Sequence, residues 1–492
     1  MSVAVVGIPQ SLAYADLAGM PPISGLYASA LPPLAAAVFA SSPYLQTGPV
    51  AITSLLTFGT LSSLATPGSP EYMRLGLGLA LIVGVVRVVL GLSRAGWVAY
   101  LMSQPMLMGF VPAAAVLITS SQLPKALGVR DFPDYDKDIF RAGWAATHPG
   151  HWGAAALVAA ALTLFVVLAG RRMHALFPGV LLCAAVATTV SALGGFSGPT
   201  VKHIPAGLPP FTADDVRLDD LSHVLVAGVV IALVGFTEAA SISRRFASED
   251  RTTWSANREF VSQGVANLVA AGTGGMPCGG SFSRSSVSRL AGARTRLTGA
   301  IAGLTVLAFL PFAGVLSPLP LAVLGAIVIS AVSGLMRFRP LVALWRVSVP
   351  QACIAWATFL GTLALAPRID RAVLLGIGLS IVVFLWRALQ LDIDVTAEAH
   401  VLTFAPRGVL WFGTAQKLDE TLIRALAAHP DARVLEIDLI RLGRIDTTGA
   451  LVLRGVLDEA RAAGLEARAR NIPPQSAQLT GRILAGERSP LA

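Results

Sequence analysis

The chain has 492 residues, of which 54% are hydrophobic and 13% are charged. Soluble domains carry about twice that share of charge, so the composition excludes a water-soluble protein over most of the length. The net charge of +9 comes from basic residues in short loops between apolar segments, which fits the positive-inside rule and not nucleic-acid binding. The three cysteines and seven histidines are scattered, which argues against a disulfide framework and against a metal site.

The first segment has no basic region and no small-residue cleavage site, so we do not expect a signal peptide. The apolar part before Pro9 is too short to cross about 30 Å of hydrocarbon. Either the first helix continues to about Leu17, or the natural chain has residues upstream of Met1.

Apolar segments of membrane-spanning length follow one another in two series of seven. The expected spans are 1–17, 25–41, 50–64, 72–93, 97–123, 151–170 and 176–194, then 221–240, 256–275, 281–290, 297–316, 319–335, 341–366 and 371–390. The third segment of each series is short, and matched short segments indicate a transporter site between inverted repeats. We therefore expect an α-helical polytopic membrane protein of about fourteen spans, with repeats at 1–194 and 221–390 and two half-helices.

The loop charges predict the orientation of these spans. Loops on one side are rich in arginine, whereas the long loops 124–150 and 194–220 on the other side balance basic residues with aspartates. This asymmetry predicts that both termini lie in the cytoplasm.

The stretch 279–286, Gly-Gly-Ser-Phe-Ser-Arg-Ser-Ser, lies between two long apolar segments. A helix that begins inside a membrane presents unpaired N–H groups and a partial positive charge. Arg284 and the hydroxyls of Ser283 and Ser285 make this start a predicted anion site. The alternative is a surface loop in which Arg284 reaches lipid headgroups.

Two further segments are expected to complete the pocket. Gly48-Pro49 breaks the backbone before 50–64, and in an inverted repeat this helix start would face the start of 281–290. Gln10 and Tyr14 share one helix face and would add an amide and a phenol. Gln10 taken alone would equally fit a hydrogen bond between two spans.

Glu238 is the one acid that we expect deep in an apolar helix, where a carboxylate must be paired, protonated or bound to a cation. Three interpretations of Glu238 stay open. Glu238 is a proton carrier, part of a sodium site with Thr237 or Ser241, or a structural partner of Arg284. A coupling role is the favoured one.

These motifs together resemble the SulP anion-transporter family. The resemblance rests on Pro9-Gln10-Ser11-Leu12-Ala13-Tyr14-Ala15, on 21–27, on Thr47-Gly48-Pro49 and on 280–285, and it covers essentially the whole chain. It implies a mobile core domain and a gate domain, usually in a homodimer. It also implies an anion pocket at five positions and a cation-coupling acid at Glu238. The five pocket positions are Gln10, Tyr14, Val50, Ser283 and Arg284.

The tail, 392–492, carries dense and nearly balanced charge, so we expect a soluble α/β domain after a transmembrane domain at 1–390. Its expected strands lie near 399–405, 408–413, 433–439 and 465–471, and its helices near 415–428, 448–463 and 474–486. It resembles STAS domains, which implies a site for a regulatory protein and for phosphorylation of Thr447 or Thr448. Asp446 is the expected N-cap of the second helix.

The sequence thus predicts a secondary active transporter of a small anion (sulfate, bicarbonate or a dicarboxylate), working by alternating access in lipid, with a bacterial inner membrane as the favoured location. We expect no enzyme and no cofactor besides a coupling ion, H⁺ or Na⁺, and proton symport is favoured over sodium symport or anion exchange. A nucleobase permease is the runner-up among transporters. A membrane-anchored sensing module is the alternative from another class.

Overall fold

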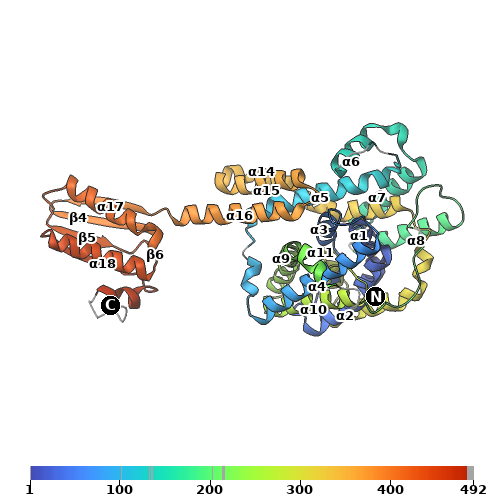
Figure 1. Ribbon diagram of the computed structural model, residues 1–492, viewed down its shortest axis with the longest axis horizontal. Helices are drawn as coiled ribbons and strands as arrows, with labels where there is room; N and C mark the ends of the chain where they lie inside the picture. The colour runs from blue at the N-terminus through green and yellow to red at the C-terminus, as the bar shows by residue number, and fades with distance from the viewer. Residues whose placement is uncertain are drawn as a thin grey trace. The chain divides into compact units, whose positions relative to one another are not determined.

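The computed structural model describes residues 2–484 except 101, 132, 134–136, 175, 202 and 213–216. The chain divides into two compact units, Met1–Gly378 and Leu379–Ala492 (Figure 1). The first unit is helical and the second is an α/β domain. The predicted boundary after Gln390 lies further along the chain than this division and stays a prediction.

One bundle of the larger unit combines the first four helices with four helices from the second half of the sequence. In it α4 packs against α9 and α10, and α2 packs against α10 and α12. Its helices are α1 (Ser2–Leu17), α2 (Pro22–Phe39), α3 (Ala51–Leu61), α4 (Pro70–Leu92), α9 (Leu218–Glu249), α10 (Ala256–Gly272), α11 (Phe282–Leu290) and α12 (Leu297–Phe309).

The other bundle is built around α5, which packs against α13 and α15. Its helices are α5 (Gln104–Leu127), α6 (Asp138–Thr147), α7 (Ala154–Met173), α8 (Gly179–Ala192), α13 (Leu321–Val332), α14 (Phe338–Val347), α15 (Val349–Leu365) and α16 (Ile369–Ala388). Short 3₁₀ turns connect the helices, at Gly96–Tyr100, Pro149–His151, Leu310–Leu316 and Ser333–Leu335.

Eight of the described helices are long and apolar enough to cross a membrane, and four further apolar helices are shorter. Each of the expected spans coincides with a helix, although some ends differ. The expected span 341–366 is two helices, because Ser348 is extended and Pro350 falls in the first turn of α15, where a missing N–H is tolerated. The expected span 97–123 begins only at Gln104, where Ser103 caps α5.

Helix α9 is longer than the predicted span 221–240. It continues to Glu249, so Arg244 and Arg245 lie on the helix and not in a loop. Glu238 is therefore well inside α9, several turns from its end.

The smaller unit is a five-stranded sheet with helices. Its strand order is β3-β4-β5-β7, with β6 (Leu442–Ile445) also pairing with β4; β3 and β4 are antiparallel and the other pairs are parallel. The other elements are β3 (Asp392–Glu398), β4 (Val401–Leu410), β5 (Val434–Asp438), β7 (Glu466–Arg470), α17 (Phe412–Ala428), α18 (Thr447–Ala462) and α19 (Ala477–Leu484).

The sequence prediction of this unit missed β3 and β6 and wrongly divided β4 into two strands. Strand β3 is largely exposed, so it shows no apolar run in the sequence, and β6 has only four residues. The predicted N-cap of α18 is confirmed, because the Asp446 carboxylate accepts a hydrogen bond from the N–H of Gly449 at 2.7 Å.

Glu259 corrects the expectation that Glu238 is the one acid deep in the apolar region. It lies in the first turn of α10 and is fully buried. Its carboxylate accepts hydrogen bonds from the backbone N–H of Ser41 at 3.2 Å, of Ser42 at 2.9 Å and from the Trp254 indole at 3.2 Å. Glu259 thus binds the segment after α2 to the start of α10.

Replacing Glu259 with Ala should destabilise the protein, because each buried donor left without an acceptor costs about 1–3 kcal/mol. Gln, which keeps one carbonyl acceptor, should fall between Ala and the wild type. The measurement is the midpoint of thermal unfolding in detergent at a fixed heating rate. Glu71→Ala is the matched control, since Glu71 also lies in the first turn of a helix but is exposed. Equal midpoints for the two Ala variants would contradict the structural role of the Glu259 hydrogen bonds.

Candidate functional site

Two very short strands pair with each other in the interior of the first bundle. Strand β1 (Thr47–Gly48) precedes α3, strand β2 (Gly279–Gly280) precedes α11, and the two pair antiparallel. The N–H of Ser281 extends this pairing by donating to the carbonyl of Gln46 at 3.0 Å. Helix α1 contacts both α3 and α11, and the three lie together in Figure 1. The two short helices therefore begin side by side, as the repeat pattern predicts.

Buried polar side chains form hydrogen bonds with residues in or next to these two paired strands. The Asn267 amide donates to the carbonyl of Cys278 at 3.1 Å and accepts from its N–H at 2.8 Å. The Gln263 amide donates to the Thr47 hydroxyl at 2.7 Å. The N–H of Gln46 donates to the Ser285 hydroxyl at 2.9 Å. Open backbone is tolerated at membrane depth only with such partners or beside a water-filled cavity.

Two glycines are required by the closeness of the chains. A Cβ at Gly280 would lie 2.7 Å from Leu45 Cδ1 and 2.8 Å from Ala239 Cβ, so any side chain would separate β2 from α9. Gly48 has a φ of +149°, which other residues rarely adopt, and a Cβ there would lie 2.8 Å from Arg284 Nη1.

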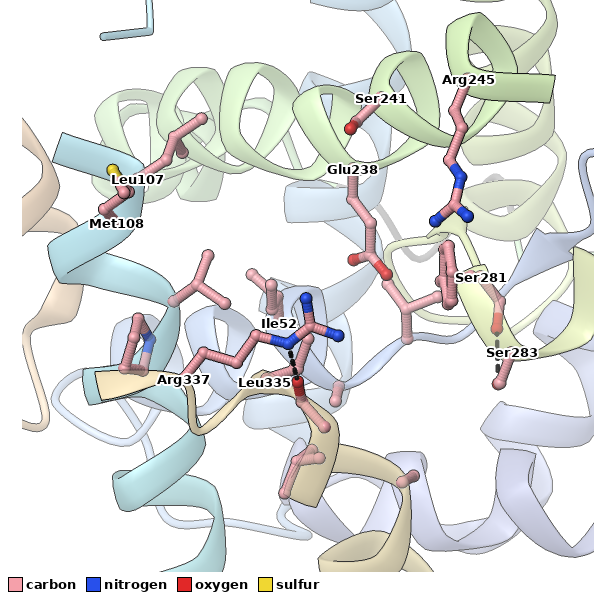
Figure 2. A pocket seen from close by; sticks show the side chains of 18 of the residues that line it. Ile52, Leu107, Met108, Glu238, Ser241, Arg245, Ser281, Ser283, Leu335 and Arg337 are labelled. Atoms are coloured by element: carbon pink, nitrogen blue, oxygen red, sulfur yellow. Dashed lines mark hydrogen bonds between the residues drawn. The ribbon is translucent and has the colours of Figure 1, made fainter. Parts of the chain in front are cut away.

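A cavity of about 580 Å³ opens beside the starts of α3 and α11. One wall comes from α1, α3, α9 and the start of α11, and the other comes from α5, α13 and the segment that leads into α14. Figure 2 shows Glu238 and Arg337 reaching into the cavity from different walls. The cavity thus lies between the two bundles.

The cavity brings together five of the side chains predicted from the sequence. These are Tyr14, Val50, Glu238, Ser241 and Ser283. The hydroxyl of Ser283 lies 3.3 Å from that of Ser281, which accepts a hydrogen bond from the N–H of Arg284 and so caps α11 (Figure 2).

The other four predicted residues do not line the cavity. Gln10 is buried, and neither atom of its amide has a hydrogen-bond partner among the described residues. The Ser285 hydroxyl accepts from Gln46, and the Thr237 hydroxyl donates to the carbonyl of Val234 at 2.6 Å. These two hydroxyls therefore have structural partners.

Arg284 lies behind the cavity wall. Its side chain is 5% exposed, and Nη2 donates to the carbonyl of Pro49 at 2.7 Å. Nε has no partner among the described residues, and the guanidinium packs against Gly48. Arg284 thus joins α11 to Pro49, the residue before the N-cap of α3, and places a positive charge near both helix starts.

Glu238 already occupies the start of α11. Its carboxylate lies beside Phe282, the first residue of that helix, which also lines the cavity, and it lies within electrostatic range of Arg284. A carboxylate at a helix N-terminus is favourable because the partial charge there is positive. Any other anion that binds at this helix start is therefore close to Glu238 and is repelled by it when Glu238 is ionised.

Sequence reasoning missed three charged residues near the site. Arg245 and Arg337 line the cavity, and Arg87 is fully buried in α4 beside α9. A signal existed for Arg87, since a lone arginine inside an apolar span is a pointer to function. No group of three or more potential metal ligands is found among the described residues.

In the smaller unit, Thr447 and Thr448 are exposed at the start of α18, next to the capping Asp446. Their hydroxyls are accessible to solvent.

Comparison with family models gives two matches. The model of the Sulfate permease family matches residues 1–358, and the model of the STAS domain matches residues 392–483.

Curated relatives are similar along the transmembrane region. Sulfate transporter 4.1, chloroplastic, of Arabidopsis thaliana is 33% identical over 77% of this chain and 56% of its own length. A probable sulfate transporter of Mycobacterium tuberculosis is 32% identical over 79% of this chain and 69% of its own length. The chain therefore spans only a little over half of the plant relative.

Two solved structures show the same fold. Murine Solute Carrier 26 family member A9, an anion transporter in the inward-facing state, matches with a TM-score of 0.88 and 20% identity, over 99% of this chain and 86% of that one. The transmembrane domain of the cyanobacterial bicarbonate transporter BicA matches with a TM-score of 0.64 and 22% identity, over 77% and 94%.

Replacing Gly48 with Ala should displace the Arg284 guanidinium from the carbonyl of Pro49, because the new Cβ would lie where Nη1 now packs. The unfavourable φ adds a cost of about 1–3 kcal/mol. The measurements are the thermal midpoint, which should fall, and a structure of the variant. Gly143→Ala, at an exposed position with no atom within 4 Å, is the control and should be neutral. An unmoved Arg284 in the Gly48 variant would contradict the packing argument.

Proposed function

Because the chain belongs to the sulfate permease family, we propose that it is a secondary active transporter of a small anion, with sulfate, bicarbonate or a dicarboxylate as the substrate class. The observation that carries this proposal is the pair of helix starts, α3 and α11, on one wall of a cavity between two bundles. Relatives are named sulfate and bicarbonate transporters, which supports this class.

The helix starts supply the attraction for an anion. The first N–H groups of a helix have no partner within the helix, and Ala51, Ile52 and Ser283 bring those of α3 and α11 to the cavity. The partial positive charges of two helix ends add to the full charge of Arg284. Tyr14 and the Ser283 hydroxyl offer further donors, and Gln10 lies nearby on α1 with an unpartnered amide.

A positive residue at the half-helix of the second repeat also separates this proposal from a nucleobase permease. Such carriers resemble one another in placing an acid there, whereas this chain has Ser283-Arg284-Ser285. A sensing module without transport would bind the anion but would not accumulate it in vesicles.

Glu238 gives the proposal a physical basis for proton coupling. An ionised Glu238, which lies beside Phe282, repels an anion at the start of α11. Protonation removes this negative charge, so proton binding and anion binding favour each other. The sodium alternative uses Glu238 with Thr237 or Ser241, of which Ser241 lines the cavity.

Transport would follow from movement of the bundle that carries the site against the bundle around α5, since the cavity lies between them. The proposal includes a homodimer in a bacterial inner membrane with both termini in the cytoplasm. It also includes a regulatory partner for the tail, with Thr447 or Thr448 as the phosphorylation site, because both are exposed.

Replacing Arg284 with Ala should lower sulfate uptake about tenfold or more, because it removes the positive charge beside both helix starts and the hydrogen bond to the Pro49 carbonyl, and such a charged hydrogen bond contributes about 1.5–3 kcal/mol. Lys keeps the charge but not the planar fork, so it should retain part of the activity. The measurement is uptake of labelled sulfate into proteoliposomes. Arg294→Ala, at an exposed arginine in the loop after α11, serves as the control. Normal uptake by the Arg284 variant would refute the pocket.

Replacing Glu238 with Gln should abolish accumulation driven by an inward proton gradient, while leaving exchange of one anion for another. Gln keeps the size of the side chain but does not titrate, and exchange needs no return of the empty carrier. Both modes are measured in the same proteoliposomes, with Asp219→Asn on the exposed start of α9 as the control. Accumulation that still follows the proton gradient in the Gln variant would defeat proton coupling, and wild-type uptake that follows sodium instead would favour the sodium site.

A further inference from the structure

Arg87 is the largest side chain of the described residues that is fully buried. Its guanidinium donates only to backbone carbonyls: Nε to Ala232 at 3.0 Å, Nη1 to Cys278 at 2.8 Å and Nη2 to Ile231 at 3.3 Å. None of the salt bridges among the described residues involves Arg87. A buried charge without a counter-charge is costly, so its presence calls for an explanation.

The position of Arg87 points to the anion site. A Cβ built on Gly235 would lie 2.7 Å from Arg87 Nη2 and 2.9 Å from the Thr53 methyl group, which belongs to the first turn of α3. The carbonyl of Cys278 directly precedes β2, and a Cβ on Gly279 would lie 2.9 Å from Val50 Cγ2. One layer of residues thus separates the guanidinium from the cavity wall.

Arg87 and Arg284 act on the same region, since the Cys278 side chain lies within electrostatic range of both. The backbone carbonyls that bind Arg87 carry only partial charges. Arg87 and Arg284 thus bring two buried guanidinium groups to this region, whereas Glu238, which is half-buried, is the one carboxylate among the described residues of the cavity lining, so positive charge is in excess. Arg337 adds further positive charge on the cavity lining, whereas Arg245, which also lines the cavity, is paired with Glu249 at 2.8 Å.

We propose that Arg87 is a specificity-determining residue that makes the site prefer divalent over monovalent anions. Its charge acts through the layer formed by Val50, Gly235 and Thr53 and requires no contact with the substrate. Its three hydrogen bonds hold α9 and the segment before β2 around that charge. This inference rests on the proposed function, because it concerns the substrate of the same site.

Coulomb's law gives the inference a quantitative form. The interaction energy is proportional to the product of the charges, so loss of one positive charge costs a divalent anion twice what it costs a monovalent one. When the positive charge is removed, the fold loss of affinity for the divalent anion is therefore the square of the fold loss for the monovalent anion. A loss of about threefold for a monovalent anion thus predicts a loss of about tenfold for sulfate.

A purely structural clamp predicts a different result. If Arg87 only holds α9 to Cys278, a variant that disturbs the clamp should weaken the binding of both anions by a similar factor. Arg87→Lys keeps the charge and loses the fork of donors, whereas Arg87→Gln keeps donors and loses the charge. The two variants therefore separate the two roles.

The experiment compares inhibition constants of unlabelled sulfate and unlabelled nitrate against labelled sulfate uptake, using full-length protein in proteoliposomes. Arg87→Gln should lose about threefold affinity for nitrate and about tenfold for sulfate, and Arg87→Lys should keep the wild-type ratio. Arg172→Gln, at an exposed arginine at the end of α7, should leave both constants unchanged.

Equal losses for the two anions in Arg87→Gln, or a Lys variant that loses the wild-type ratio, would overturn the inference. If the Gln variant does not fold, Arg87→Met, which also removes the charge, takes its place: a larger loss for sulfate than for nitrate supports the charge role, and equal losses refute it. Wild-type protein that takes up no labelled sulfate would instead refute sulfate as the substrate in the proposed function, which is a distinct result.

Discussion

Backbone N–H and carbonyl groups have no water to bind inside a membrane, and the rest of the larger unit is arranged around this constraint. Two segments of the chain leave the helical conformation between apolar spans, at Thr47–Gly48 and at Gly279–Gly280. They satisfy part of their hydrogen bonds by pairing with each other. Asn267 and Arg87 bind the Cys278 carbonyl just before the second strand. The result is a hydrogen-bonded pair of short strands, each followed by a helix that begins inside the bundle.

The same constraint creates the candidate site. A helix interrupted inside the bundle has a start as well as a break, and the N–H groups at that start need partners. At α11 the capping Ser281 binds one of them, and the Glu238 carboxylate lies beside the first residue of the helix, so part of the site is occupied by the protein itself. An anion in the cavity would complete the set. The same helix starts thus leave backbone N–H groups in need of partners and provide the positive partial charges that attract an anion.

The sequence predicted the helix starts and several cavity residues, because hydropathy and the Gly-Pro and Gly-Gly breaks are local signals. It did not predict the direction of the Arg284 side chain, which binds the carbonyl of Pro49 from the other repeat. It also missed Glu259, whose partners Ser41 and Ser42 are more than two hundred residues away in the chain. Such contacts depend on how distant segments pack, and a single sequence carries no direct signal of that packing.

The central claim is that an anion binds at the paired starts of α3 and α11, and the most direct measurement is an anomalous X-ray structure of the full chain with selenate. Selenate is a tetrahedral divalent anion like sulfate, and selenium gives a distinct anomalous peak. The account predicts a peak in the cavity beside Val50 and Ser283, within hydrogen-bond distance of the first N–H groups of both helices. A peak confined to Arg245 and Arg337, with none at the helix starts, would contradict it.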